Sequence, residues 1–151
     1  MIIWCNKDYL TIISDKEPKT AVLKPLPSDN FFEREAKKEK PYLNKLEVTF
    51  TVNYLGTVYV IDIPKGYTWN GANIPRCFWC LIGSMGESSF LDASMVHDIL
   101  TEKKCLVAYD RQLSSMIFRE LLIASGVSKF KANIMYKAVD IYQKLFCDWS
   151  S

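Results

Sequence analysis

A chain of 151 residues, of which 49% are apolar and 24% charged, is long enough to form one domain, because a chain of about this length buries roughly two thirds of its unfolded surface. Its 19 Lys and Arg residues against 17 Asp and Glu residues leave a net charge of +2. We therefore expect no nucleic-acid partner, since phosphate binding needs clustered, unpaired cations.

The start of the chain does not have the pattern of a targeting signal. Met1 to Cys5 are apolar, but they lack a basic region and are soon followed by Lys7 and Asp8, so we expect no secretory signal peptide. No apolar run approaches the roughly 20 residues that cross a bilayer, and we expect no transmembrane segment. Five cysteines are an odd number, which favours reduced thiols over a disulfide framework.

Alternating hydrophobicity predicts an antiparallel sheet in the N-terminal half. Between Leu46 and Tyr54 apolar residues alternate with polar ones, which is the period of a half-buried strand, and Leu55-Gly56 is suited to a tight hairpin turn. We expect strands at residues 2–4, 9–13, 46–54 and 57–63, and a short extended piece at 67–69.

Residues 15–45 differ from the rest of the N-terminal half. They hold four of the six prolines and a charged stretch from Glu33 to Lys40. Because the charges are of both signs, we interpret this segment as a solvated insertion or flexible loop, with a short helix around 31–39.

We expect three helices after Gly86, at about 88–102, 108–124 and 128–145. Asp92 is well placed in the first turn of the first helix, where a carboxylate favours the helix dipole, and Gly126 is suited to end the second. The third has one broad apolar face, which we predict to be core: Phe130, Ile134, Met135, Ala138, Ile141, Tyr142 and Leu145. Strands first and helices last predict an α+β fold, an N-terminal antiparallel β-sheet with a C-terminal three-helix layer, in a single domain over residues 1–151.

His97 and Asp98 are the residues best suited to carry chemistry. His97 is the only histidine in the chain, and the two side chains can flank one site because neighbours on a helix point about 100° apart. A short connection predicts that the next helix packs antiparallel, which would bring Asp110 toward His97. A carboxylate on one imidazole nitrogen leaves the other as a base or metal ligand. The alternative is that the pair only caps, pairs or packs.

The loop at residues 70–76 is a second candidate feature. Its Asn-Gly pair favours a tight turn. Arg76 is a candidate anion clamp, or else a structural ion-pair partner of a helix carboxylate, Asp92, Asp98 or Asp110. Cys77 and Cys80 follow as one C-x-x-C pair. A structural zinc site needs two such pairs or suitably spaced histidines, so we interpret these cysteines as buried thiols.

Several motifs follow one another in a fixed order along the chain: Gly66-Tyr67-Thr68-Trp69-Asn70-Gly71-Ala72-Asn73-Ile74-Pro75-Arg76, then Asp92-Ala93, His97-Asp98, Tyr109-Asp110 and Gly126-Val127. In this order they resemble the family known as domain of unknown function 1353, over about residues 46–145. Members of that family occur in bacteriophages and prophages. The resemblance implies a phage-encoded protein in the host cytoplasm or the virion, with other virion proteins or a host factor as partners, and it implies no established activity.

The chain departs from the family pattern at the loop and at the end of the His-Asp helix. Asn70 stands where the family usually has Asp, and Asn73 where it has Ser, while Ile99 and Thr101 replace parts of a tyrosine-containing segment. If the family Asp is an acid or a metal ligand, Asn70 weakens that role.

A looser likeness concerns helix pattern. A His-Asp pair on one helix and an Asp on an antiparallel helix are similar to phospholipase A2 and to the capsid lipases of parvoviruses. This likeness implies that His97 is a general base, Asp98 a calcium ligand and Asp110 the orienting carboxylate. Backbone carbonyls of the loop at Asn70 would complete the metal shell. The G-x-G calcium loop of those enzymes is missing here.

Two functions from different classes follow. The first is a phage-encoded hydrolase that uses His97, Asp98 and Asp110, assisted by calcium or zinc, on a lipid or cell-envelope substrate. The second is a non-catalytic phage protein, a virion or tail component or a host-interaction protein, in which the motif locks a loop onto a helix. Exposure discriminates between them, because a catalytic His97 must line an open pocket, whereas a structural one is buried and saturated with hydrogen bonds.

Overall fold

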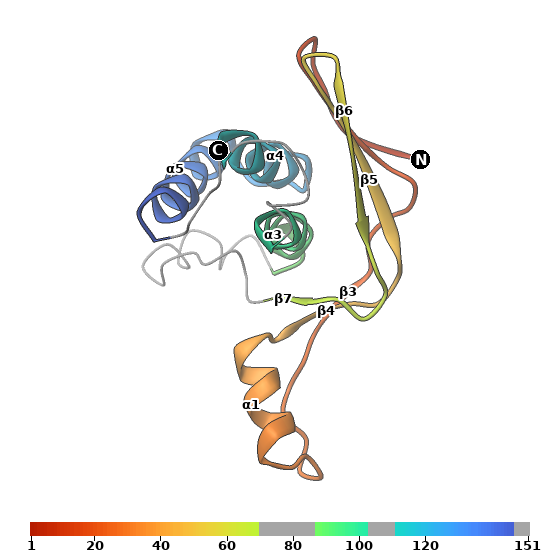
Figure 1. The fold of residues 1–151 in the computed structure, drawn as a ribbon, viewed down its shortest axis with the longest axis vertical. Coiled ribbons are helices and arrows are strands. Elements are labelled where there is room, and N and C mark those ends of the chain that lie inside the picture. Colours follow the sequence, from red (N-terminus) through yellow and green to blue (C-terminus); the bar gives the residue numbers. More distant parts are fainter. Residues whose placement is uncertain (70–86, 103–110, 147–151) are drawn as a thin grey trace.

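Antiparallel sheets form the N-terminal half of the molecule and helices form the C-terminal half (Figure 1). The structure is a computed structural model that describes residues 1–69, 87–102 and 111–146. This arrangement confirms the predicted α+β class.

The main sheet has four antiparallel strands in the order β1-β2-β5-β6. Its strands are β1 (Ile2–Asn6), β2 (Leu10–Ser14), β5 (Val48–Tyr54) and β6 (Thr57–Ile63). The alternation of β5 places Val48, Phe50 and Val52 in the core. Leu55 and Gly56 form the predicted hairpin turn with positive φ angles of 52° and 85°, as a tight turn between twisted strands requires.

The charged segment between β2 and β5 contains more regular structure than the sequence predicted. The expected helix is present as α1 (Phe31–Glu39), but the segment also holds β3 (Thr20–Val22) and β4 (Tyr42–Asn44). These strands pair with β7 (Thr68–Trp69) in a second sheet of order β3-β4-β7. Strands of three residues are too short to produce a readable alternation, which is why the sequence did not indicate them.

The three expected helices are α3 (Glu87–Glu102), α4 (Arg111–Ala124) and α5 (Lys129–Phe146). Gly126, with a φ of 105°, follows α4 as predicted, and the Ser128 hydroxyl accepts a hydrogen bond of 3.3 Å from the Lys131 amide at the start of α5. Among the described helices, none is both long and apolar enough to span a membrane.

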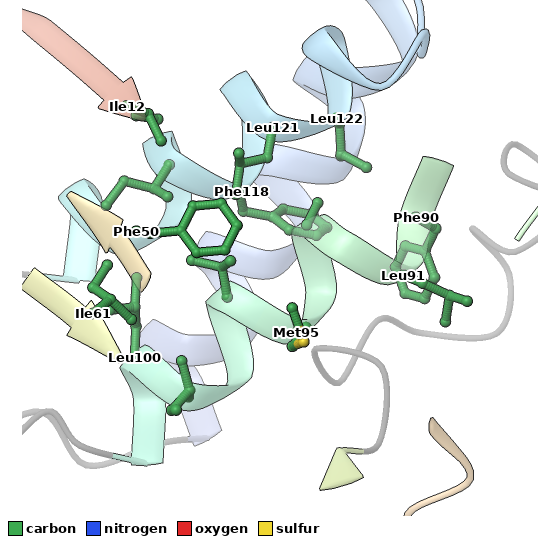
Figure 2. Close-up of a cluster of buried hydrophobic side chains, with 14 of the residues drawn as sticks. Ile12, Phe50, Ile61, Phe90, Leu91, Met95, Leu100, Phe118, Leu121 and Leu122 are labelled. Atoms are coloured by element: carbon green, nitrogen blue, oxygen red, sulfur yellow. The ribbon is translucent and has the colours of Figure 1, made fainter. Parts of the chain in front are cut away.

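The core lies between the main sheet and the helices (Figure 2). Ile12, Phe50 and Ile61 of the sheet face Leu100 of α3 and Phe118 of α4. From residue 90 to residue 100, every side chain of α3 except that of Asp92 is buried. α3 is therefore a central helix, buried around most of its circumference between residues 90 and 100.

The prediction for the buried face of α5 was wrong in part. Met135 is buried, but Phe130, Ile141 and Leu145 are 74%, 55% and 66% exposed. The residues that face the core are Ala132, Met135, Val139 and Gln143. α5 carries apolar residues on two opposite faces, and helical spacing cannot tell which one packs against α4.

The same substitution, made once on the buried face and once on the exposed face of the main sheet, tests which face of the sheet packs against the core. Val52 is 0% exposed and Val60 is 58% exposed. Val52→Thr should lower the free energy of unfolding by about 1–3 kcal/mol, because it buries an unpaired hydroxyl. Val60→Thr is the matched control and should change it by less than about 0.5 kcal/mol. Urea denaturation of the two variants measures both, and equal losses would contradict the assignment of the two faces.

Candidate functional site

His97 lies inside the molecule, where α3 packs on α4. Its side chain is 0% exposed. Its ring contacts that of Phe118, with centroids 5.3 Å apart and an interplanar angle of 55°. The core packing of α3 thus turns His97 away from solvent.

Neither ring nitrogen of His97 has a hydrogen-bond partner among the described residues. Burial lowers the pKa of His97 to about 3, because a charged imidazolium is costly to remove from water. The hydroxyl of Ser114, one turn before Phe118 on α4, is likewise buried with no partner in the described part of the chain. His97 is therefore a neutral imidazole at neutral pH. It is buried as a structural residue would be, but the described residues do not supply the hydrogen bonds expected of one.

Asp98 is also buried, at 5% exposure. Its backbone carbonyl accepts a hydrogen bond of 2.9 Å from the Thr101 hydroxyl. Thr101 thus makes a local hydrogen bond within the last turns of α3.

The structure places two of the predicted site residues next to each other, His97 and Asp98. The other three predicted site residues, Asn70, Arg76 and Asp110, lie outside the described residues, as do Cys77 and Cys80. Their approach to His97 and the metal role of Asn70 stay predictions. Within the described residues, no group of three or more His, Cys, Asp or Glu side chains could hold a metal ion.

A contact that the sequence did not reveal holds β7 to α3. The Trp69 indole nitrogen donates a hydrogen bond of 2.8 Å to the Ser94 hydroxyl, which donates one of 3.0 Å to the Leu91 carbonyl. Trp69 is fully buried and its ring stacks on that of Tyr67. Because Ser94 lies one turn before Asp98 on α3, this bond fixes the residue just before the Asn-Gly motif to the His-Asp helix.

Asp92 is the second titratable group of α3 with an unusual environment. Burial raises the pKa of its carboxyl to about 7, and the negative charge of Glu17 adds to the rise. The sequence predicted a place in the first turn of the helix, but α3 begins at Glu87, so Asp92 lies in its second turn. Asp92 is only partly buried, and this partial burial could not be seen without the packing of the helix.

A separate polar cluster connects the β1–β2 turn to α4. The Glu120 carboxylate accepts hydrogen bonds from Lys7 Nζ at 2.7 Å and from the Arg119 guanidinium at 3.2 Å, and it lies 3.7 Å from the Cys5 thiol. Burial, followed by the Glu120 charge, raises the pKa of the Cys5 thiol. Cys5 is free and buried, and Lys7 is 43% exposed, so this cluster is a partly buried ion pair and not a reactive thiol site.

Comparison with known proteins identifies the family. Residues 46–139 match the family described as protein of unknown function (DUF1353). This match covers more than half of the chain, and the chain belongs to this family. The matched range begins two residues before β5 and ends within α5, so it includes the hairpin of the main sheet and all of α3 and α4.

A curated relative is an uncharacterized protein of Sinorhizobium fredii, y4jT, which is 35% identical over 104 residues. The alignment covers 64% of this chain and 29% of the relative, so the chain spans less than a third of the length of that protein. No solved structure shows significant similarity to the chain.

The raised pKa of Asp92 predicts a stability that depends on pH. The folded state binds the proton more tightly than the unfolded state, with a pKa of about 7 against 3.8. The contribution of this residue to stability is therefore lost as the pH rises between these values. Asp92→Asn has no titrating group at this position. The difference between its free energy of unfolding and that of the wild type should therefore rise by about 1 kcal/mol or more as the pH is raised from about 4 to about 8.

Urea denaturation at several pH values measures this difference. Asp8→Asn, a substitution at an exposed aspartate, provides the control. A constant difference between Asp92→Asn and the wild type across the pH range would contradict the burial of the carboxyl.

Proposed function

We propose that this protein is a non-catalytic phage or prophage protein, a virion or tail component or a factor that binds a host protein. The observation that carries the proposal is the complete burial of His97 against Phe118. A general base must come within hydrogen-bond distance of its substrate or of a water molecule. A ring enclosed by core side chains is badly placed for this task.

The charge state of His97 supports the same conclusion. A general base works best when its pKa is close to the working pH, and the pKa of His97 is held at about 3 by burial. Such an imidazole accepts a proton only weakly at neutral pH. His97 and Asp98 would then act within the fold, as part of the packing of α3.

The position of the family motifs supports a binding role for the neighbouring loops. The Asn-Gly motif, which the sequence predicts to be a loop, follows β7 directly along the chain, and the Trp69–Ser94 hydrogen bond holds β7 to α3. Loops held by a rigid scaffold are the usual place for recognition. In this proposal the buried helix supports the loops and the loops contact a virion or host protein.

One observation favours a second candidate, a hydrolase assisted by calcium or zinc that acts on a lipid or cell-envelope substrate. Buried polar atoms are nearly always hydrogen-bonded, yet both nitrogens of His97 lack a partner in the described residues. A neutral imidazole is the form that binds metal ions, and the buried Asp98 follows it. In this candidate Asp110 would orient His97, and Arg76 would bind an anionic group of the substrate.

His97→Leu distinguishes the two candidates through stability. If His97 only packs, an apolar residue of similar size should leave the free energy of unfolding unchanged or raise it by up to about 2 kcal/mol, because unpaired buried nitrogens are removed. The pKa of His97 rises from about 3 in the folded state to 6.5 in the unfolded state, so the wild type loses stability as the pH falls below 6.5, and the variant should escape this loss.

Urea denaturation of His97→Leu between about pH 5 and pH 8 measures both effects. Met95→Leu, at a buried apolar position of the same helix, is the matched control. A loss of more than about 2 kcal/mol in His97→Leu alone would mean that the nitrogens make bonds essential to the protein, and the structural role would then be wrong.

Metal titration tests the hydrolase candidate directly. We expect calorimetry with calcium and with zinc to show no saturable binding to the wild type. Asp98→Asn should lower the melting temperature, because the Asp98 side chain is buried. Saturable binding that Asp98→Asn abolishes would instead establish a metal site and overturn the non-catalytic proposal.

A further inference from the structure

The outer face of α5 is an apolar stripe bordered by lysines. Phe130, Ile141 and Leu145 lie on this face and are more than half exposed. At about 100° per residue, they point away from the face that packs on α4. Lys137 and Lys144 are exposed on the same side, and neither forms an ion pair within the described part of the chain. We call this surface the α5 stripe.

A second exposed apolar surface lies on the arm, which we define as residues 23–41. Figure 1 shows α1 standing away from the sheets and from the other helices, and none of its residues is buried. Phe31 and Phe32 at its start are 69% and 80% exposed, with their rings 5.7 Å apart. Two large aromatic side chains thus lie in water at the far end of the molecule.

The arm is nevertheless a structured element. The Asn30 side chain caps α1 by accepting a hydrogen bond of 2.8 Å from the Glu33 amide. Lys37 forms an ion pair of 2.6 Å with Asp29, and the Arg34 guanidinium donates to backbone carbonyls of residues 26, 27 and 29. Asp29, the acceptor of that ion pair, is itself only 5% exposed. Because no residue of α1 is buried, these bonds and not core packing hold the helix in place.

The same bonds determine which face of α1 is free. Arg34 and Lys37 point toward the loop before the helix, so the opposite face carries Phe31, Phe32 and the two acidic residues Glu35 and Glu39. Glu35 is 52% exposed and forms an ion pair of 3.5 Å with Lys38, whose side chain is 68% exposed. The free face of the arm therefore carries two aromatic rings and two carboxylates with Lys38 at its border, whereas the α5 stripe is apolar and carries two lysines.

We propose that the arm of one copy of this chain docks on the α5 stripe of a second copy. Both surfaces are apolar, and the carboxylates of Glu35 and Glu39 complement Lys137 and Lys144, which favours a helix seated on an apolar face. Figure 1 shows the arm and α5 well separated within one chain. In a twofold-symmetric dimer each arm would cover the α5 stripe of its partner, so both exposed surfaces are buried at once. Both surfaces are remote from α3, and the inference stands independently of the proposed function.

Sedimentation of the full chain over about two decades of concentration tests the association. We expect a monomer–dimer equilibrium. Phe31→Ser with Phe32→Ser, which removes only exposed side chains, should raise the dissociation constant at least about tenfold and leave the melting temperature of the monomer unchanged. Val58→Ser with Val60→Ser removes exposed apolar residues of β6 and is the matched control, which should leave the dimer intact.

Charge reversal tests the pairing of the two surfaces. Glu35→Lys with Glu39→Lys, and separately Lys137→Glu with Lys144→Glu, should each weaken the homodimer at least about tenfold. A mixture of these two variants should form a heterodimer, because each arm then meets an α5 stripe of opposite charge. All four substitutions in one chain keep the wild-type net charge and should restore the homodimer.

Three results would overturn the proposal: a wild type that stays monomeric throughout, a dimer that the arm and stripe variants leave unchanged, and a dimer that only the β6 control dissociates. A monomeric wild type would mean that the α5 stripe binds another protein or a further part of a longer chain.

Discussion

The enclosure of α3 is the constraint on which the rest of the structure depends. The helix has the main sheet on one side and α4 on the other, so it can present almost no side chain to water. Yet its sequence includes Ser94, His97 and Asp98, which are polar. Each of these groups is placed in a medium of low dielectric constant by the burial of the apolar residues around it, and each must be hydrogen-bonded or uncharged for the fold to be stable.

Two titratable groups of α3 respond to this constraint in opposite directions. Burial lowers the pKa of His97 and raises that of Asp92, and both shifts favour the neutral form. Ser94 is accommodated in another way, through its hydrogen bonds with Trp69 and the Leu91 carbonyl. The protonation states of His97 and Asp92 are thus set by packing, and this is why the burial of His97 weighs more in the proposed function than its identity as a histidine.

The outer parts of the molecule are not constrained by burial in the core. α1 and the outer face of α5 make no contribution to the core, yet both carry large apolar side chains. A surface of this kind normally has a partner. The internal hydrogen bonds of the arm hold α1 in a defined orientation before any partner binds, so that docking would lose little conformational entropy. Support of loops by α3 and association through the arm are compatible, because they use separate surfaces.

Local signals in the sequence determined most of the elements, and tertiary contacts decided which surfaces they bury. The alternation from Leu46 to Tyr54 predicted β5, and Gly126 predicted the end of α4, since each signal depends on a few neighbouring residues. β3 and β4 were missed because they exist only through pairing with distant strands. His97 and Asp98 could be chosen from residue type alone, but their burial could not, because it depends on the partners of α3. The apolar face of α5 was predicted to be core, and only packing against α4 decided between two faces that are equally helical in their spacing.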